Sequence, residues 1–291
     1  MGTKEWLLLM VLSILWGGSF LFVEIAVKQI KPFTLVFARV SLASLVLLLI
    51  IYLTGRKMPS SPFLWLSFLI LGVFNNLIPF SLIAWGQTRI DSSLAAILNA
   101  TTPIFSVVLA HFLTREERLN FNRIVGVLCG WLGVIILIGV KAFKTMDIEF
   151  LSQIAILIAS CSYALAAIFG RRFKDMDSII VAAGMLCCSS IMLLPLSLIF
   201  DHPWQMQISI ETLACVISLS VVSTAFAYLI YFYILAKSGA TNILLVTFLI
   251  PVSAIFLGMT ILNEQLRYSD FAGMLLIFIG LIIIDGRLIG K

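Results

Sequence analysis

Charge is scarce in this 291-residue sequence, in which Asp, Glu, Lys and Arg together make up 11% of the residues. Soluble domains contain about 25% charged and roughly 45–50% apolar residues, whereas hydrophobic residues account for 62% of this chain. An apolar excess of this size is more than the core of a soluble domain can enclose, so the remainder must face lipid. The low charge content therefore excludes an ordinary soluble fold and predicts an integral membrane protein.

Other features that would define a function are also missing. The formal net charge of +5 is spread over short connectors without forming a basic stripe, so nucleic acid is not expected as a partner. The five cysteines lie in apolar stretches without the paired spacing of metal or redox motifs, and we interpret them as buried hydrophobic side chains. Since no nucleophile motif or acidic pair is recognisable within an apolar stretch, the sequence predicts neither an enzyme, nor a metal site, nor a cofactor.

Ten apolar stretches are long enough to cross a bilayer, whose hydrocarbon core of about 30 Å requires about 20 helical residues. They cover residues 6–27, 33–53, 63–87, 92–113, 123–140, 150–170, 179–200, 212–235, 242–262 and 270–284. The first stretch lacks the short apolar core and the cleavage site of a secretory signal, so we expect it to be retained. The predicted fold class is an all-α membrane protein with ten transmembrane helices.

The positions of Lys and Arg predict the orientation, because cytoplasmic loops are enriched in them. With the amino terminus inside, twelve of the 19 Lys and Arg residues lie on the inner side and six on the outer side. Arg39 is left within a span. This distribution predicts both termini in the cytoplasm.

The first half of the sequence recurs in the second half at an offset of 147 to 148 residues. Matched pairs are Trp16 with Tyr163, Pro103 with Pro251, and Glu117 with Glu264. Each half carries five spans, and because five is odd, the second half crosses the membrane in the opposite sense. The sequence therefore predicts two inverted-topology five-helix repeats, at residues 1–140 and 150–291, joined by a connector at 141–149. Secondary transporters commonly have this organisation, with a binding site near the midplane, although a structural protein can also arise by duplication.

Short motifs in both halves resemble the drug/metabolite transporter superfamily, specifically its EamA-type permeases with ten spans. The resemblance rests on the order of Trp16-Gly17-Gly18-Ser19-Phe20, Phe37-Ala38-Arg39, Pro103, Thr224-Ala225-Phe226-Ala227-Tyr228, Pro251-Val252 and Asn263-Glu264. It implies a small-solute permease of a bacterial inner membrane, often an exporter of amino acids or related metabolites. The family's usual glycine before the glutamate is Asn263 here, so we expect a different cap at that helix end.

Polar and aromatic residues near the middle of the spans are the candidate binding residues. Pro103 and Pro251 each free a backbone carbonyl, which then needs neighbouring protein or a water-filled cavity; a simple packing kink is the alternative. Trp16 and Tyr163 lie away from the membrane interfaces, so their polar groups need a solute, a cavity water or a neighbouring helix. The full predicted set is Trp16, Asn76, Phe80, Asn99, Pro103, Tyr163, Thr224, Tyr228, Tyr231, Thr247 and Pro251. These residues predict an uncharged cavity with aromatic walls.

Two ionisable residues lie inside spans, where such groups are costly and commonly functional. Glu24 and Arg39 lie at similar depth in neighbouring spans, so they are a candidate gate or coupling pair that an ion pair could join. Snorkelling or structural pairing is the alternative interpretation. Since neither an acid nor a base is expected at the centre of a span, a phosphate-bearing solute is disfavoured.

Together these features predict a secondary transporter that moves a small neutral or zwitterionic organic solute outward by alternating access. An amino acid or related metabolite is the expected solute. The alternatives are transport of a nucleotide sugar or a drug, an intramembrane enzyme, and a non-transporting scaffold. Gly126 and Gly133, with Gly273 and Gly280, have the spacing of close helix contacts, which favours packing within the bundle or a homodimer.

Overall fold

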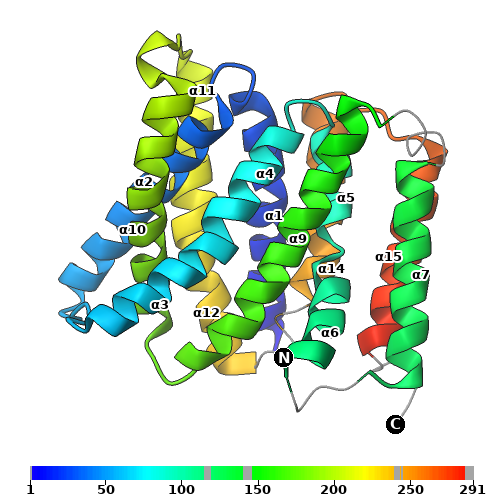
Figure 1. Cartoon of the computed structure of the whole chain (residues 1–291), viewed down its shortest axis with the longest axis horizontal. Coiled ribbons are helices and arrows are strands. Elements are labelled where there is room, and N and C mark those ends of the chain that lie inside the picture. The colour runs from blue at the N-terminus through cyan, green and yellow to red at the C-terminus, as the bar shows by residue number, and fades with distance from the viewer. Residues whose placement is uncertain (1, 115–118, 140–145, 239–242, 244, 286–291) are drawn as a thin grey trace.

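The computed structural model describes residues 2–114, 119–139, 146–238, 243 and 245–285 of the chain. All regular secondary structure within these ranges is helical (Figure 1). Helices dominate because a bilayer core offers no hydrogen-bond partners, so each spanning segment must satisfy its own backbone groups. The predicted all-α membrane protein is confirmed.

The first half forms five spans. These are α1 (Thr3–Ala26), α2 (Pro32–Leu53), a third span of α3 (Pro62–Gly72), η1 (Val73–Leu77) and α4 (Ile78–Gly86), a fourth of α5 (Ser92–Asn99) and α6 (Thr102–Leu113), and α7 (Phe121–Ile138).

The second half repeats this order. It contains α9 (Ile148–Gly170) with η2 (Arg171–Phe173), α10 (Ser178–Leu196) with η3 (Ser197–Asp201) and η4 (Pro203–Gln205), an eighth span of α11 (Ile210–Ile217), η5 (Ser218–Phe226) and α12 (Ala227–Ser238), then α14 (Val246–Ile261) and α15 (Tyr268–Asp285).

The described residues contain nine helical spans of 18 residues or more that are apolar enough to cross a membrane, and α14 is a shorter apolar helix of 16 residues. Part of the predicted ninth stretch, including residues 242 and 244, lies outside the described residues. Helix α1 begins and α15 ends on the same side of the bundle (Figure 1). We call this side the terminal face, and the side where α1 ends and α15 begins the distal face.

Glycines bring the last span of each half together. A Cβ atom added at Gly133 would lie 2.6 Å from the Gly273 carbonyl oxygen, and one at Gly126 would lie 2.6 Å from the Gly280 carbonyl oxygen. Helices α7 and α15 therefore touch through their backbones, as small residues in membrane helices allow. The predicted close packing occurs within this chain, at one edge of the bundle (Figure 1).

The end of α14 has a left-handed residue. Asn263 has a φ of +55°, and the backbone N–H of Glu264 then donates to the Gly258 carbonyl oxygen at 3.1 Å. Asn tolerates this conformation better than other residues with a side chain. Asn263 therefore ends the helix with the backbone geometry that glycine commonly supplies. Glu117, the repeat partner of Glu264, lies outside the described residues.

Candidate functional site

Two π-helical segments interrupt the third and eighth spans at positions related by the repeat. Segment η1 covers Val73–Leu77 and η5 covers Ser218–Phe226. A π turn inserts one extra residue into the helix and is frequent at functional sites. The inserted turns place Asn75 and Asn76 from the first half, and Thr224 from the second, in the interior of the bundle.

Arg39 of α2 extends into this interior. Its side chain is only 8% exposed, and its Nε donates to the Thr224 hydroxyl at 3.0 Å. The centre of the guanidinium lies 3.7 Å from the centroid of the Phe80 ring, which is a cation–π geometry. The expectation of an uncharged centre is therefore wrong. That expectation used the position of the Arg39 backbone within its span. The long side chain instead places the charged group among the aromatic residues.

Aromatic rings from four spans make contacts with one another in this part of the bundle. Phe80 of α4 makes an edge contact with Tyr163 of α9 at a centroid distance of 6.3 Å. Trp16 of α1 lies 5.5 Å from Tyr231 of α12. Phe232 of α12 contacts two further rings. Its ring centroid lies 5.2 Å from that of Tyr231 and 6.0 Å from that of Tyr228. We define the central cluster as Trp16, Arg39, Asn75, Phe80, Tyr163, Thr224, Tyr228, Tyr231 and Phe232.

The two asparagines of η1 have different surroundings. The Asn76 amide is fully buried and donates to the Ser189 hydroxyl of α10 at 3.0 Å. Asn75 instead donates to the Tyr228 hydroxyl at 3.1 Å, so Asn75 contacts the central cluster. The sequence-based set included Asn76 and omitted Asn75. A π turn shifts the facing side chain by one position, which an α-helical period does not reproduce.

Asn99 and Pro103 mark a break in the fourth span, between α5 and α6. Pro103 cannot donate to the Asn99 carbonyl oxygen, which instead accepts from the hydroxyl groups of Thr102 at 2.8 Å and Ser160 at 3.5 Å. Protein hydroxyl groups thus satisfy the freed carbonyl, as in the packing-kink alternative. The side-chain oxygen of Asn99 is buried and has no hydrogen-bond partner among the described residues.

Thr247 and Pro251 belong to α14, which packs against α1. Pro251 is buried and Thr247 is half-buried. The Ser253 hydroxyl donates to the Ser13 carbonyl oxygen at 2.6 Å, and a Cβ at Gly17 would lie 2.9 Å from the Ala254 backbone nitrogen. In the described part of the chain, no hydrogen bond or ring contact joins Asn99, Pro103 or Pro251 to the central cluster.

The two candidate gate residues are not paired with each other. Glu24 accepts a hydrogen bond from the Gln87 amide at 3.3 Å, and the same amide donates to the Phe20 carbonyl oxygen at 2.8 Å. Arg39 is bound to Thr224 and Phe80 instead. Glu24 therefore belongs to the distal end of α1 and Arg39 to the central cluster, and the possible ion pair is not formed in this conformation.

This arrangement is an all-helical membrane bundle whose polar and aromatic side chains meet at its centre. The sequence profile of the EamA-like transporter family matches residues 3–139 and matches again at residues 151–285. The chain therefore belongs to this family and is a membrane transporter of the EamA type.

Individual relatives cover nearly the whole chain. The uncharacterized transporter YoaV of Bacillus subtilis is 24% identical over 270 residues, which is 92% of each chain. The uncharacterized inner membrane transporter YedA of Escherichia coli is 23% identical, covering 95% of this chain and 89% of YedA. A solved structure at 18% identity covers 99% of both chains with a TM-score of 0.70, which shows a shared fold.

Proposed function

We propose that this protein is a secondary transporter that moves a small zwitterionic organic solute, an amino acid or a related metabolite, by alternating access. The observation that carries the proposal is the composition of the central cluster. Arg39 and Phe80 come from the first half, whereas Tyr163, Thr224 and Tyr228 come from the second. A site shared between two halves changes its access when the halves rock against each other.

The proposed location is a bacterial inner membrane, with both termini in the cytoplasm and transport outward. The excess of Lys and Arg on the terminal face supports the orientation. The name of YedA supports the inner membrane. Under this orientation the distal face is the outer one.

Reconstitution of the full chain in liposomes tests the proposal. We expect counterflow of at least one compound from a panel of labelled amino acids and metabolites, and loss of that counterflow in Trp16→Ala and Tyr163→Ala. Unchanged counterflow in both variants would favour a site elsewhere. Absence of any movement in the wild type, with or without a proton gradient, would contradict the proposal.

The direction of transport needs intact cells. Intracellular and extracellular metabolite concentrations are compared between cells with and without the gene. An outward carrier raises the extracellular level of its solute, while an importer lowers it, so the same measurement names the solute and its direction.

A further inference from the structure

We propose that Arg39 is the anchor for a single carboxylate group of the transported solute. This inference rests on the proposed function, because it assigns the chemistry of the transport site described above. The occupant we assign is an organic monocarboxylate with an apolar body, of which an amino acid zwitterion is the simplest example.

The first argument is the unused bonding capacity of Arg39. A guanidinium group has five N–H donors and no acceptor. Within the described residues, only the Nε–H of Arg39 has a hydrogen-bond acceptor, the Thr224 hydroxyl. Both terminal nitrogens, Nη1 and Nη2, remain available side by side. This pair is the edge of the guanidinium that binds a carboxylate in a bidentate geometry.

The second argument is the missing negative charge. Arg39 is more than nine-tenths buried, and the salt bridges of the described residues do not include it. Glu24 is bound to Gln87 instead. A buried cation in a membrane protein is costly without a charged partner, and the Phe80 ring offsets only part of that cost. An anionic ligand would supply the remaining compensation.

The third argument is the surplus of donors on two tyrosines of the central cluster: Tyr163 contacts Phe80, the ring that lies against the guanidinium, and Tyr228 belongs to the same span as Thr224. The Tyr228 oxygen already accepts from Asn75, so its own hydroxyl hydrogen is left to donate. Tyr163 touches Phe80 through its ring, and its hydroxyl has no hydrogen-bond partner among the described residues. Arg39, Tyr163 and Tyr228 therefore each keep a donor group that an acceptor-only ligand such as a carboxylate can use.

The choice of a monocarboxylate follows from the count of charges. Arg39 is the one basic residue in the central cluster, so it matches one negative charge and not the two of a phosphate dianion. Phe80 lies against the guanidinium, and the rings of Trp16, Tyr231 and Phe232 in the same cluster present further apolar surface. A solute with one carboxylate and an apolar body fits this combination.

The test compares amino acids with their carboxamides, which keep the body and lose the carboxylate. Binding of the twenty common amino acids and their amides to the purified full-length protein is measured by calorimetry at pH 7, and inorganic phosphate and chloride are the free-anion probes. We expect at least one acid to bind 10-fold or more tightly than its amide. Arg39→Met should weaken binding of that acid at least 30-fold and that of the amide less than threefold. Arg39→Lys should give an intermediate loss, and the exposed Arg56→Gln serves as the control for loss of one arginine.

If Arg39→Met does not fold, Tyr163→Phe and Tyr228→Phe provide the test instead. Each variant removes one hydroxyl donor and keeps the aromatic ring. Each should reduce the preference for the acid three- to tenfold. Equal losses for acid and amide, wild-type preference in all these variants, or absence of binding would overturn the assignment. Displacement of the amino acid by phosphate or chloride at equal concentration would also overturn it, in favour of an inorganic anion site.

Parallel transport in liposomes separates the two proposals. Acid-selective binding without transport supports the Arg39 assignment and contradicts the transporter proposal for these solutes. Equal transport of acid and amide supports the transporter and overturns the assignment.

Discussion

The two faces of the bundle hold the two halves together by different kinds of contact. At the distal face, Glu264 of the second half accepts hydrogen bonds from the backbone N–H groups of Ser92 and Ser93, at 2.9 and 3.0 Å, and from both hydroxyl groups. Asp201 accepts from the Thr34 backbone N–H at 2.7 Å. Both carboxylates thus lie at helix amino termini, where unpaired N–H groups and the helix dipole favour negative charge.

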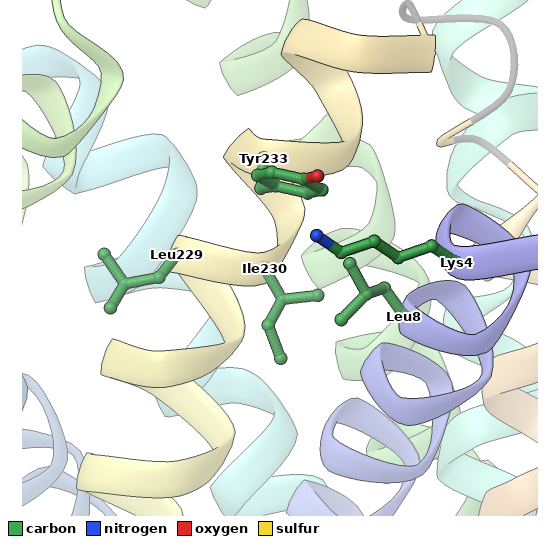
Figure 2. Close-up of a pocket in the computed structure, with 5 residues that line it drawn as sticks. All are labelled: Lys4, Leu8, Leu229, Ile230 and Tyr233. Carbon is green, nitrogen blue, oxygen red and sulfur yellow. The ribbon is translucent and has the colours of Figure 1, made fainter. Parts of the chain in front are cut away.

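Two polar contacts between the halves lie at exposed positions of the terminal face. Arg56 and Asp177 form an ion pair at 2.9 Å, with side chains that are 38% and 37% exposed. The Lys4 ammonium lies 5.1 Å from the Tyr233 ring centroid, beside an open apolar hollow of about 290 Å³ between α1 and α12 (Figure 2). Apolar packing contributes there as well, since Phe68 stacks on the ring of Phe173.

This difference has a consequence for the alternating access proposed above. Hydrogen bonds to a carboxylate are directional and are lost within a small displacement, whereas apolar surfaces can slide while remaining in contact. For the alternating access proposed above, we infer that the distal contacts hold the closed side in this conformation, and that the terminal contacts seen among the described residues are the easier ones to separate. With the termini in the cytoplasm, as we propose, this is a conformation closed to the outside.

Removal of Glu264 should have the largest effect. Glu264→Ala leaves two backbone N–H groups and two hydroxyl groups at the start of α5 without their acceptor. We expect the free energy of local opening to fall by about 2–3 kcal/mol. Hydrogen exchange of the Ser92 and Ser93 amides should accelerate roughly 30- to 150-fold.

Glu149→Ala is the control, because Glu149 is an acid of the same face whose partner Arg267 is 69% exposed. Its effect on the same amides should stay within about 0.5 kcal/mol. Equal exchange rates in the two variants would contradict a gate built on Glu264.

Removal of the Asp201 side chain should have the second-largest effect. Asp201→Ala removes the acceptor of one partly buried N–H near the start of α2, which costs about 1–2 kcal/mol at comparable helix caps. Exchange of the Thr34 amide should accelerate roughly 5- to 30-fold. The exposed Asp175→Ala serves as the matched control, and unchanged exchange of the Thr34 amide would show that Asp201 does not secure this end.

Arg56→Gln should have a much smaller effect at the terminal face. Ion pairs this exposed contribute little, because water screens them and ordering two long side chains costs entropy. We expect the free energy of unfolding in detergent to change by less than about 0.5 kcal/mol. A loss as large as that of Glu264→Ala would remove the difference between the faces.

Hydropathy was sufficient to predict the all-helical membrane fold. The apolar stretches coincide with the helical spans to within a few residues, because lipid enforces both length and composition. The offset near 147 also pairs two segments, η1 and η5, that prove to share a π-helical distortion. No sequence pattern predicts the π-helical turns themselves, since they depend on how the span that contains the extra residue packs against neighbouring helices.

The site was predictable in its residue types but not in its contacts. Five predicted aromatic residues make ring contacts: Trp16 contacts Tyr231, Phe80 contacts Tyr163, and Tyr228 contacts Phe232. A side chain that reaches several ångströms along the membrane cannot be placed by the depth of its backbone, which is why the central charge of the cluster was missed. In the sequence, Glu264 follows the end of a predicted span. Its actual partners lie on a helix more than 170 residues away, a distance that no local pattern encodes.

The contact of Lys4 should also contribute little, and it permits a test of the whole comparison. Lys4→Met removes a cation–π contact at an exposed position, worth about 0.5–1 kcal/mol at most, and the methionine still covers Leu8 and Ile230 in the hollow of Figure 2. Lys4 and Arg56 share no partner, so their effects should add. The double variant Lys4→Met with Arg56→Gln should therefore lower the free energy of unfolding by less than Glu264→Ala alone, as measured by thermal unfolding in one detergent. If the double variant costs more, the terminal face is the more firmly held, and the closed side must be reassigned to it.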